Sequence, residues 1–172
     1  KELIRDEQYN KATEMLDKYS EGYKNNNLTE IVSDNIVLNY LLNRKINQCR
    51  EAGIDMACYI LGNIAGVDDM DLYILLENLC DNAIEAASTS KDKKLGIEIY
   101  EVKGIIQIII SNTYDNAIEK DKVGNERYST KGKNRGHGLL LVKRILNENN
   151  RITSETKITD SLYIQTIKIN EK

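Results

Sequence analysis

Two asparagines stand one helical turn apart in residues 77–86, which read Glu-Asn-Leu-Cys-Asp-Asn-Ala-Ile-Glu-Ala. Asn78 and Asn82 share one side of a helix. The acidic residues of the segment form a row beside them, namely Glu77, Asp81 and Glu85. Because asparagine weakens a helix, this pair is expected to have a use beyond helix formation. Amide oxygens are neutral ligands for Mg²⁺, which takes one or two protein oxygens together with substrate phosphates. The alternative is an ordinary solvated helix face.

A second group of residues has the chemistry of an anion site. Tyr-Ser-Thr-Lys-Gly at residues 128–132 is followed by Gly-His-Gly-Leu at residues 136–139, where a helix is expected to begin. Glycines let the backbone approach an anion closely, and the N–H groups of a first helical turn bind phosphate oxygens. Lys131 would add a positive charge. A Gly-x-Gly before a helix is weak evidence alone, and the two commoner nucleotide fingerprints do not fit.

The composition narrows the possible classes of function. The chain has 172 residues, a formal net charge of −3 and one histidine, His137. The acidic balance argues against nucleic-acid binding, which needs clustered Lys and Arg. A single histidine excludes a His triad or a His-rich metal site built within this chain. The three cysteines sit among apolar residues without a Cys-x-x-Cys spacing, which predicts buried thiols in a reducing compartment.

Residues 1–52 are predicted to be an antiparallel helical hairpin that ends before Gly53. Apolar residues recur at spacings of three and four from Tyr9 to Tyr23, as in a coiled-coil seam, and Leu38, Leu42 and Cys49 share a face of the second helix. A dimeric four-helix bundle would cover both stripes. The alternative is that the hairpin packs on the rest of the chain.

Residues 53–172 are predicted to form a mixed α/β domain that positions the two polar groups. The asparagines lie on a helix from Asp68 to about residue 87, whose acidic residues suit a helix N-terminus. Residues 95–102 and 105–111 are expected to pair about a tight Lys-Gly turn. The other expected elements are a strand at 54–60, a polar segment at 113–135, a helix at 138–149 and strands at 151–157 and 162–169.

In this order, the motifs resemble a known family. The sequence looks like the ATP-binding domain of sensor histidine kinases. It shares with that domain, in the same order, the segment at residues 77–86, a strand ending in Ser-Asn, the polar segment, Ser-Thr-Lys-Gly and Gly-His-Gly-Leu. Its nucleotide fold is shared with the gyrase, heat-shock-ninety and mismatch-repair ATPases (GHKL). The hairpin and residues 41–45 and 53–55 are similar to the peptide-pheromone receptor kinases of the accessory gene regulator type, AgrC and VirS. The resemblance implies a two-layer α/β sandwich of the Bergerat type.

The same resemblance implies a site for ATP and Mg²⁺. It assigns Asn82 to the Mg²⁺ that bridges the phosphates and Asn78 to support of that site, with Thr130 and Lys131 on the phosphates. The expected catalytic residues are therefore Asn78, Asn82 and Lys131. The residues expected to bind the cofactor are Asn78, Asp81, Asn82, Asn112, Thr130, Lys131, Gly132, Gly136, His137, Gly138 and Leu139.

Asn112 marks a departure from most of the family. Histidine kinases usually carry Asp-x-Gly-x-Gly after the strand, and its Asp accepts a hydrogen bond from the adenine amino group. Residues 111–115 instead read Ser-Asn-Thr-Tyr-Asp, so Asn112 would accept through an uncharged amide oxygen. This weaker adenine contact motivates an alternative, an interaction module that keeps the fold without binding nucleotide.

As a function, the resemblance implies transfer of the ATP γ-phosphoryl group to a histidine upstream of residue 1, and from there to a response regulator. The chain would be the cytoplasmic portion of a membrane-anchored quorum-sensing receptor, with an upstream sensor domain and a homodimer formed through the hairpin. For His137, three interpretations stay open: the phosphoacceptor, a donor to a phosphate oxygen, or a solvated loop residue. The enzyme alternative is an anti-sigma-factor serine kinase of the same superfamily.

Overall fold

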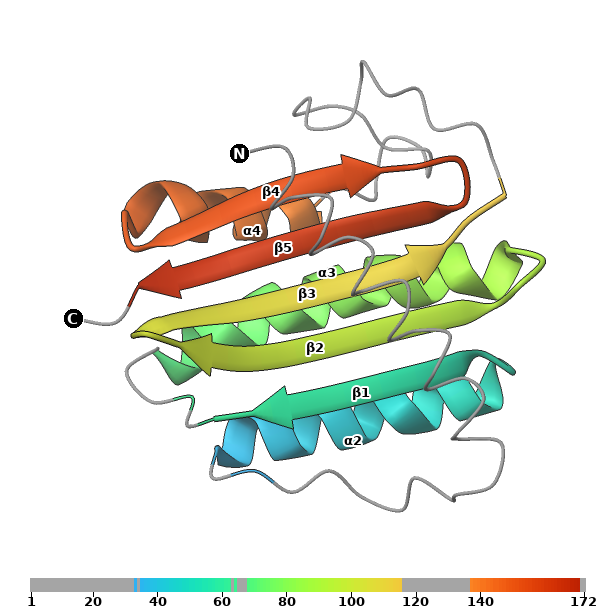
Figure 1. Ribbon diagram of the computed structural model, residues 1–172, viewed down its shortest axis with the longest axis horizontal. Coiled ribbons are helices and arrows are strands. Elements are labelled where there is room, and N and C mark those ends of the chain that lie inside the picture. The colour runs from blue at the N-terminus through green and yellow to red at the C-terminus, as the bar shows by residue number, and fades with distance from the viewer. Residues whose placement is uncertain (1–32, 34, 63, 65–67, 116–136, 171–172) are drawn as a thin grey trace.

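A computed structural model describes residues 33, 35–62, 64, 68–115 and 137–170. This part of the chain forms one five-stranded sheet with its helices on one face (Figure 1). The elements in chain order are α2 (Ile36–Glu51), β1 (Asp55–Leu61), α3 (Asp69–Thr89), β2 (Lys94–Val102), β3 (Ile105–Thr113), α4 (His137–Glu148), β4 (Ile152–Ile158) and β5 (Leu162–Asn170). The predicted two-layer α/β sandwich is confirmed, and each expected element of residues 54–169 is present within a residue or two of its predicted ends.

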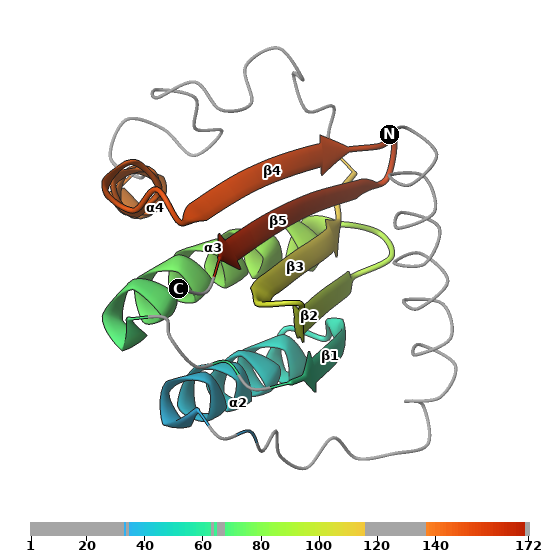
Figure 2. The ribbon, with the colours of Figure 1, turned by 60° about the vertical axis from the view of Figure 1, so that its left-hand side comes forward.

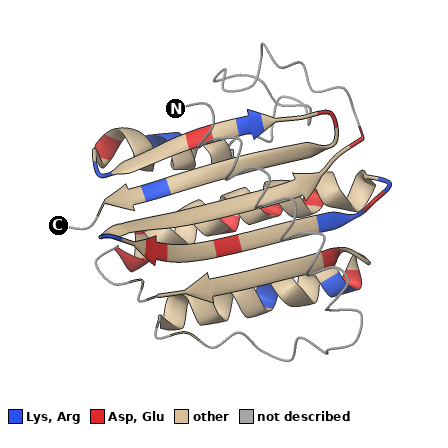
Figure 3. Cartoon of the chain, in the orientation of Figure 1, with Lys and Arg blue, Asp and Glu red and all other residues tan. Residues whose placement is uncertain are grey.

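The strands lie in the order β1-β2-β3-β5-β4. β1 and β2 run parallel and are joined through α3, whereas the other neighbours are antiparallel. The turn between β2 and β3 has positive φ angles at Lys103 (54°) and Gly104 (74°), as a two-residue hairpin of the predicted kind requires. β3, at the centre of the sheet, carries no charged residue, while Lys, Arg, Asp and Glu are interspersed on the neighbouring elements (Figure 3).

The core lies between the sheet and its three helices, which Figure 2 shows side by side along one face of the sheet. Alternate residues of each strand point toward the helices, and in β3 these are Ile106, Ile108 and Ile110, each at most 2% exposed. Asn112 continues this alternation at the end of β3. It therefore lies on the helix-covered side of the sheet, where it is 3% exposed.

Helix α2 belongs to the same core as the sheet. Its Leu38, Leu41 and Leu42 are fully buried in one cluster with residues of α3 and β1. The predicted helix stop is confirmed, since Gly53 follows the C-cap with a φ of 67°. For residues 36–51 the packing therefore matches the alternative in which the helix packs on the rest of the chain. Residues 1–32 lie outside the described part, so the hairpin and its dimer stay predictions.

The three cysteines are buried free thiols, as their apolar surroundings predict. Burial raises the pKa of Cys49 from its ordinary value of 9.0 to about 11 and that of Cys58 to about 12. These thiols are therefore protonated and unreactive at neutral pH. Among the described helices, none combines the length and the apolar character that a membrane crossing requires.

Candidate functional site

The two asparagines lie near the middle of α3, the longest described helix. Asp68 caps its N-terminus by accepting hydrogen bonds from the backbone N–H groups of Met70 and Asp71. The rotation of α3 about its axis is set by an apolar stripe that packs on the sheet, namely Leu72, Leu75, Leu76, Leu79, Cys80, Ala83 and Ala87. This packing places Asn78 and Asn82 beside the stripe, where both are half-buried.

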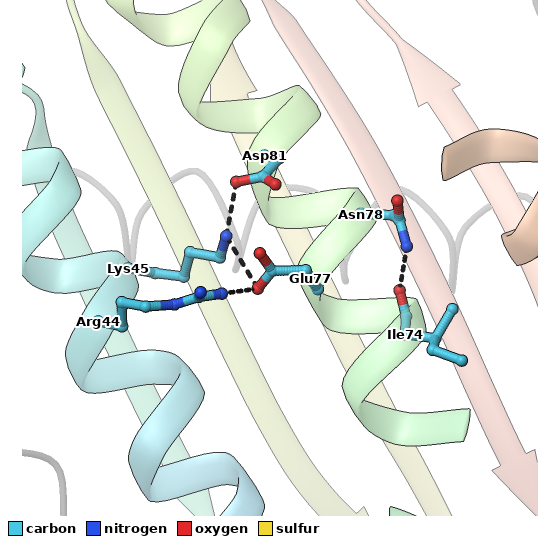
Figure 4. Close-up of polar contacts among 6 residues, drawn as sticks. All are labelled: Arg44, Lys45, Ile74, Glu77, Asn78 and Asp81. Atoms are coloured by element: carbon cyan, nitrogen blue, oxygen red, sulfur yellow. Dashed lines mark hydrogen bonds and ion pairs between the residues drawn. The ribbon is translucent and has the colours of Figure 1, made fainter. Parts of the chain in front are cut away.

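Asn78 meets the first turn of α4. Its Nδ2 donates a hydrogen bond to the carbonyl of Ile74, at 2.6 Å, and this bond sets the orientation of the amide (Figure 4). The other end, Oδ1, lies against Gly138, because a Cβ built on that glycine would come within 2.2 Å of the oxygen. Only glycine fits there without a shift of Asn78. The fold thus brings together the two motifs that the sequence placed about 60 residues apart.

Two acidic residues of α3, Glu77 and Asp81, contact helix α2. Lys45 of α2 is fully buried, and its Nζ lies 2.5 Å from Asp81 Oδ1 and 3.0 Å from Glu77 Oε2. Arg44 also donates to Glu77, and this bond raises the pKa of the guanidinium. Figure 4 shows these contacts on one side of α3 and Asn78 on the other. The structure therefore gives Asp81, expected to bind the cofactor, an ion pair with Lys45.

Sequence reasoning missed the role of Arg44 and Lys45. A signal was present, because Lys45 continues the buried stripe of Leu38, Leu41 and Leu42 at helical spacing. A lysine at such a position needs a partner of opposite charge, and carboxylates at i and i+4 on a neighbouring helix supply it. What the sequence lacked was any indication that α2 and α3 are neighbours.

Asn112 lies among buried polar side chains where α3 leads into β2. Its Nδ2 donates to the carbonyl of Thr113, so the acceptor oxygen forms the other end of the amide. The hydroxyl of Thr113 lies 2.7 Å from that of Ser90 and accepts from the backbone N–H of Lys94. These bonds hold the end of β3 to the C-terminus of α3. A buried amide in this position has the fixed geometry that recognition of a base requires.

The remaining predicted site residues fall largely outside the described ranges, namely Thr130, Lys131, Gly132 and Gly136. His137 is the first residue of α4, and its side chain is not described, so the three interpretations of it stay open. Leu139 lies in the first turn of α4 and is 44% exposed. The structure therefore places the start of the predicted phosphate-binding helix beside Asn78 and leaves the preceding segment as a prediction.

The donor set fits a magnesium ion that arrives with a nucleotide better than a resident metal. Among the described residues, no group of three or more His, Cys, Asp or Glu could hold a metal ion. Mg²⁺ bound to a triphosphate needs only one or two protein oxygens, because phosphates and water supply the others. The half-buried amide of Asn82 can supply such an oxygen, and Asn82 would be the metal ligand.

Comparison with known proteins decides the family. The model of the GHKL domain family matches residues 67–170, which span α3 to β5. This chain belongs to the GHKL domain family. The matched range contains Asn78, Asn82, Asn112 and Gly138, so these four residues lie inside the family's domain.

Known relatives agree with this GHKL assignment. A probable C4-dicarboxylate sensor kinase of Bacillus subtilis (strain 168) is 31% identical over 128 residues, which cover 63% of this chain and 22% of that protein. The chain thus spans about a fifth of that relative. The catalytic domain of histidine kinase ThkA has a TM-score of 0.63 at 20% identity, over 81% of this chain and 93% of that one. The Acinetobacter baumannii histidine kinase AdeS gives 0.61 at 21% identity, over 99% and 82%.

The predicted GHKL domain, with the fold of histidine-kinase catalytic domains, is thereby confirmed. A third structural match is a complex of ThkA with the response regulator protein TrrA, at a TM-score of 0.63 and 19% identity, over 99% of this chain and 50% of that one.

Proposed function

We propose that this GHKL domain binds Mg-ATP between α3 and α4 and donates the γ-phosphoryl group to a histidine of a sensor histidine kinase. The observation that carries the proposal is the contact between Asn78 and Gly138. This contact brings the side of α3 that carries Asn78 and Asn82 against the first turn of α4. The N-terminus of α4 offers backbone N–H groups to phosphates, and Asn82 offers an oxygen to Mg²⁺. Phosphoryl transfer depends mainly on such positioning and neutralisation of charge.

The bound nucleotide would span the two ends of the site. Asn82 would hold Mg²⁺ on the phosphates, and the buried amide of Asn112 would accept a hydrogen bond from the adenine amino group. Thr130 and Lys131 would contact the phosphates from the segment before α4, with Lys131 adding a positive charge. In the related ATPases, a Glu one helical turn before the metal-binding Asn activates water for hydrolysis. In this chain Asn78 occupies that position and has no carboxylate to do so. The domain is therefore expected to favour transfer to a protein over hydrolysis of ATP.

The phosphoacceptor would be a histidine outside this sequence. The one histidine present, His137, begins α4 beside the site itself, whereas an acceptor must approach the γ-phosphate in line from another element. A response regulator would then take the phosphoryl group. The structural match to ThkA bound to the regulator TrrA supports this partner class. A homodimer through the hairpin predicted for residues 1–52 and a membrane-anchored sensor domain complete the proposed receptor.

The receptor type is a finer proposal. The runs at residues 41–45 and 53–55 support the peptide-pheromone class of the accessory gene regulator type. The name of the Bacillus relative favours a second candidate, a sensor of C4-dicarboxylates. Addition of a secreted peptide or of succinate to the membrane-embedded full-length protein distinguishes them, because only the cognate ligand changes the rate of autophosphorylation.

The experiment that tests the function is phosphorylation of the full-length protein with γ-labelled Mg-ATP. We expect label that is lost in acid and kept in alkali, because a phosphoramidate bond on histidine hydrolyses in acid. Acid-stable label would favour the serine-kinase alternative. Absence of both labelling and Mg-ATP binding would favour an interaction module without nucleotide and would contradict the proposal.

A further inference from the structure

The ion pairs between α2 and α3 join two acidic residues of the 77–86 segment to a helix that carries none of the site motifs. Lys45 contributes a fully buried ammonium to Glu77 and Asp81, and Arg44 reaches Glu77 from the neighbouring position. The four groups carry two positive and two negative charges, so their net charge is zero. The cluster thus neutralises two of the acidic residues on α3.

Stability alone does not account for this cluster. Removing an ammonium from water is costly, and a buried ion pair is often no more stabilising than apolar residues of the same volume. The neighbouring positions of α2 are occupied by leucines that are fully buried. A further leucine or methionine at position 45, with uncharged residues opposite, would complete the same stripe. The charges are therefore expected to serve another purpose.

The position of the cluster indicates that purpose. Glu77 and Asp81 directly precede Asn78 and Asn82 in the sequence, so each carboxylate lies about 100° around the same helical turn from an amide. In Figure 4 the carboxylates of Glu77 and Asp81 point toward α2, and Asn78 lies on the other side of α3. Each carboxylate is thus less than about one helix diameter from the neighbouring amide. At that distance an unpaired carboxylate would repel a triphosphate bound at the amides and compete for its Mg²⁺.

We propose that Lys45 is a positioning residue of the nucleotide site. It acts through Asp81 and Glu77, which it neutralises and holds on the α2 side of α3, so that neither of these two carboxylates turns toward the α4 side. This inference rests on the proposed binding of ATP. It also gives Asp81 a role different from the one expected from sequence, as a partner of Lys45 instead of a ligand of the cofactor.

The charge balance makes predictions of opposite sign. Lys45→Met leaves the cluster one unit more negative and should weaken Mg-ATP binding by about three- to tenfold at low ionic strength, less in high salt. Asp81→Asn leaves it one unit more positive and should tighten binding by a similar factor. The double variant restores neutrality and should bind as the wild type does. Adenosine, which is uncharged, should bind all four proteins equally.

The measurement is titration of the chain with Mg-ATP and with adenosine, followed by calorimetry and NMR. Lys168→Met is the matched control, because it removes a lysine from the sheet face opposite the helices and should leave both affinities unchanged. Equal loss of ATP and adenosine affinity in Lys45→Met would reveal a purely structural role and overturn the inference. Weak binding by the double variant would also overturn it, since Lys45 would then contact the phosphates itself.

Two further outcomes keep the test decisive. If circular dichroism shows that Lys45→Met does not fold, Asp81→Asn decides alone, and weaker binding by that variant would make Asp81 a ligand and overturn the inference. If the wild-type chain does not bind Mg-ATP, the proposed function fails first and the inference falls with it. Wild-type binding with an unaffected Lys45→Met variant overturns only the inference.

Discussion

Helix α3 has a different kind of neighbour on each side. On the α2 side, Leu38, Leu41 and Leu42 are fully buried, and the buried Lys45 forms ion pairs with two carboxylates of α3. On the α4 side, the buried residues of α4 among those whose side chains are described are Val142 and Ile145, while its first turns expose three leucines at 42% to 48%, namely Leu139, Leu140 and Leu141. We call the α2 side of α3, with its buried leucines, the closed side. The α4 side, with its exposed leucines, is the open side, and the proposed nucleotide would lie there.

This difference shows how one helix serves both stability and binding. The closed side supplies buried apolar area, which is the main source of folding free energy. The open side keeps polar residues half-buried, which costs stability but leaves oxygens and N–H groups for a ligand. Substitutions of the buried apolar residues on the α2 side should therefore change the free energy of unfolding, and substitutions on the α4 side should change affinity for Mg-ATP.

The largest effect is expected from Leu42→Ala on the closed side. Removing a fully buried leucine leaves a cavity and should lower the free energy of unfolding by about 2–5 kcal/mol. Chemical denaturation followed by far-UV circular dichroism measures this change. The matched control is Ile36→Ala in the same helix, whose side chain is 83% exposed, with an expected change within about 0.5 kcal/mol. Equal effects of the two variants would contradict the assignment of α2 to the core.

A smaller change in free energy is expected from Gly138→Ala on the open side. The added Cβ would come within 2.2 Å of Asn78 Oδ1, so α4 must move away from α3. Mg-ATP binding should weaken by about tenfold, or roughly 1.4 kcal/mol, with little change in stability. In Asn78→Ala/Gly138→Ala the clash is gone, and the double variant should bind no worse than Asn78→Ala. Additive losses, measured by calorimetry, would show that this contact does not limit position 138.

Much of the fold could be predicted from the sequence because its signals are local. The acidic residues that favour a helix start near Asp68, the Lys103-Gly104 turn and Gly53 as a helix stop each act within a few residues, and all three are confirmed. The domain boundary was harder to place. The same apolar stripe of α2 suits a coiled-coil partner or a sheet, and only tertiary packing distinguishes them.

The candidate site shows the same division. Asn78, Asn82 and Gly138 could be found from spacing, since residue types that weaken a helix or free its backbone are informative alone. The pairing of Lys45 with Asp81 could not be found, because it joins residues 36 positions apart on helices whose contact the sequence does not reveal. Asp81, which its motif predicts as a cofactor-binding residue, therefore also has an ion pair on a neighbouring helix that the sequence does not reveal.

The central claim is that the open side of α3 binds Mg-ATP through Asn82, and calorimetric titration of the wild type and Asn82→Ala with Mg-ATP tests it most directly. The wild type should bind, and loss of the metal ligand should weaken binding by about 10- to 100-fold while circular dichroism shows that the fold is kept. Equal affinities of the two proteins for Mg-ATP, with the fold intact, would contradict the account.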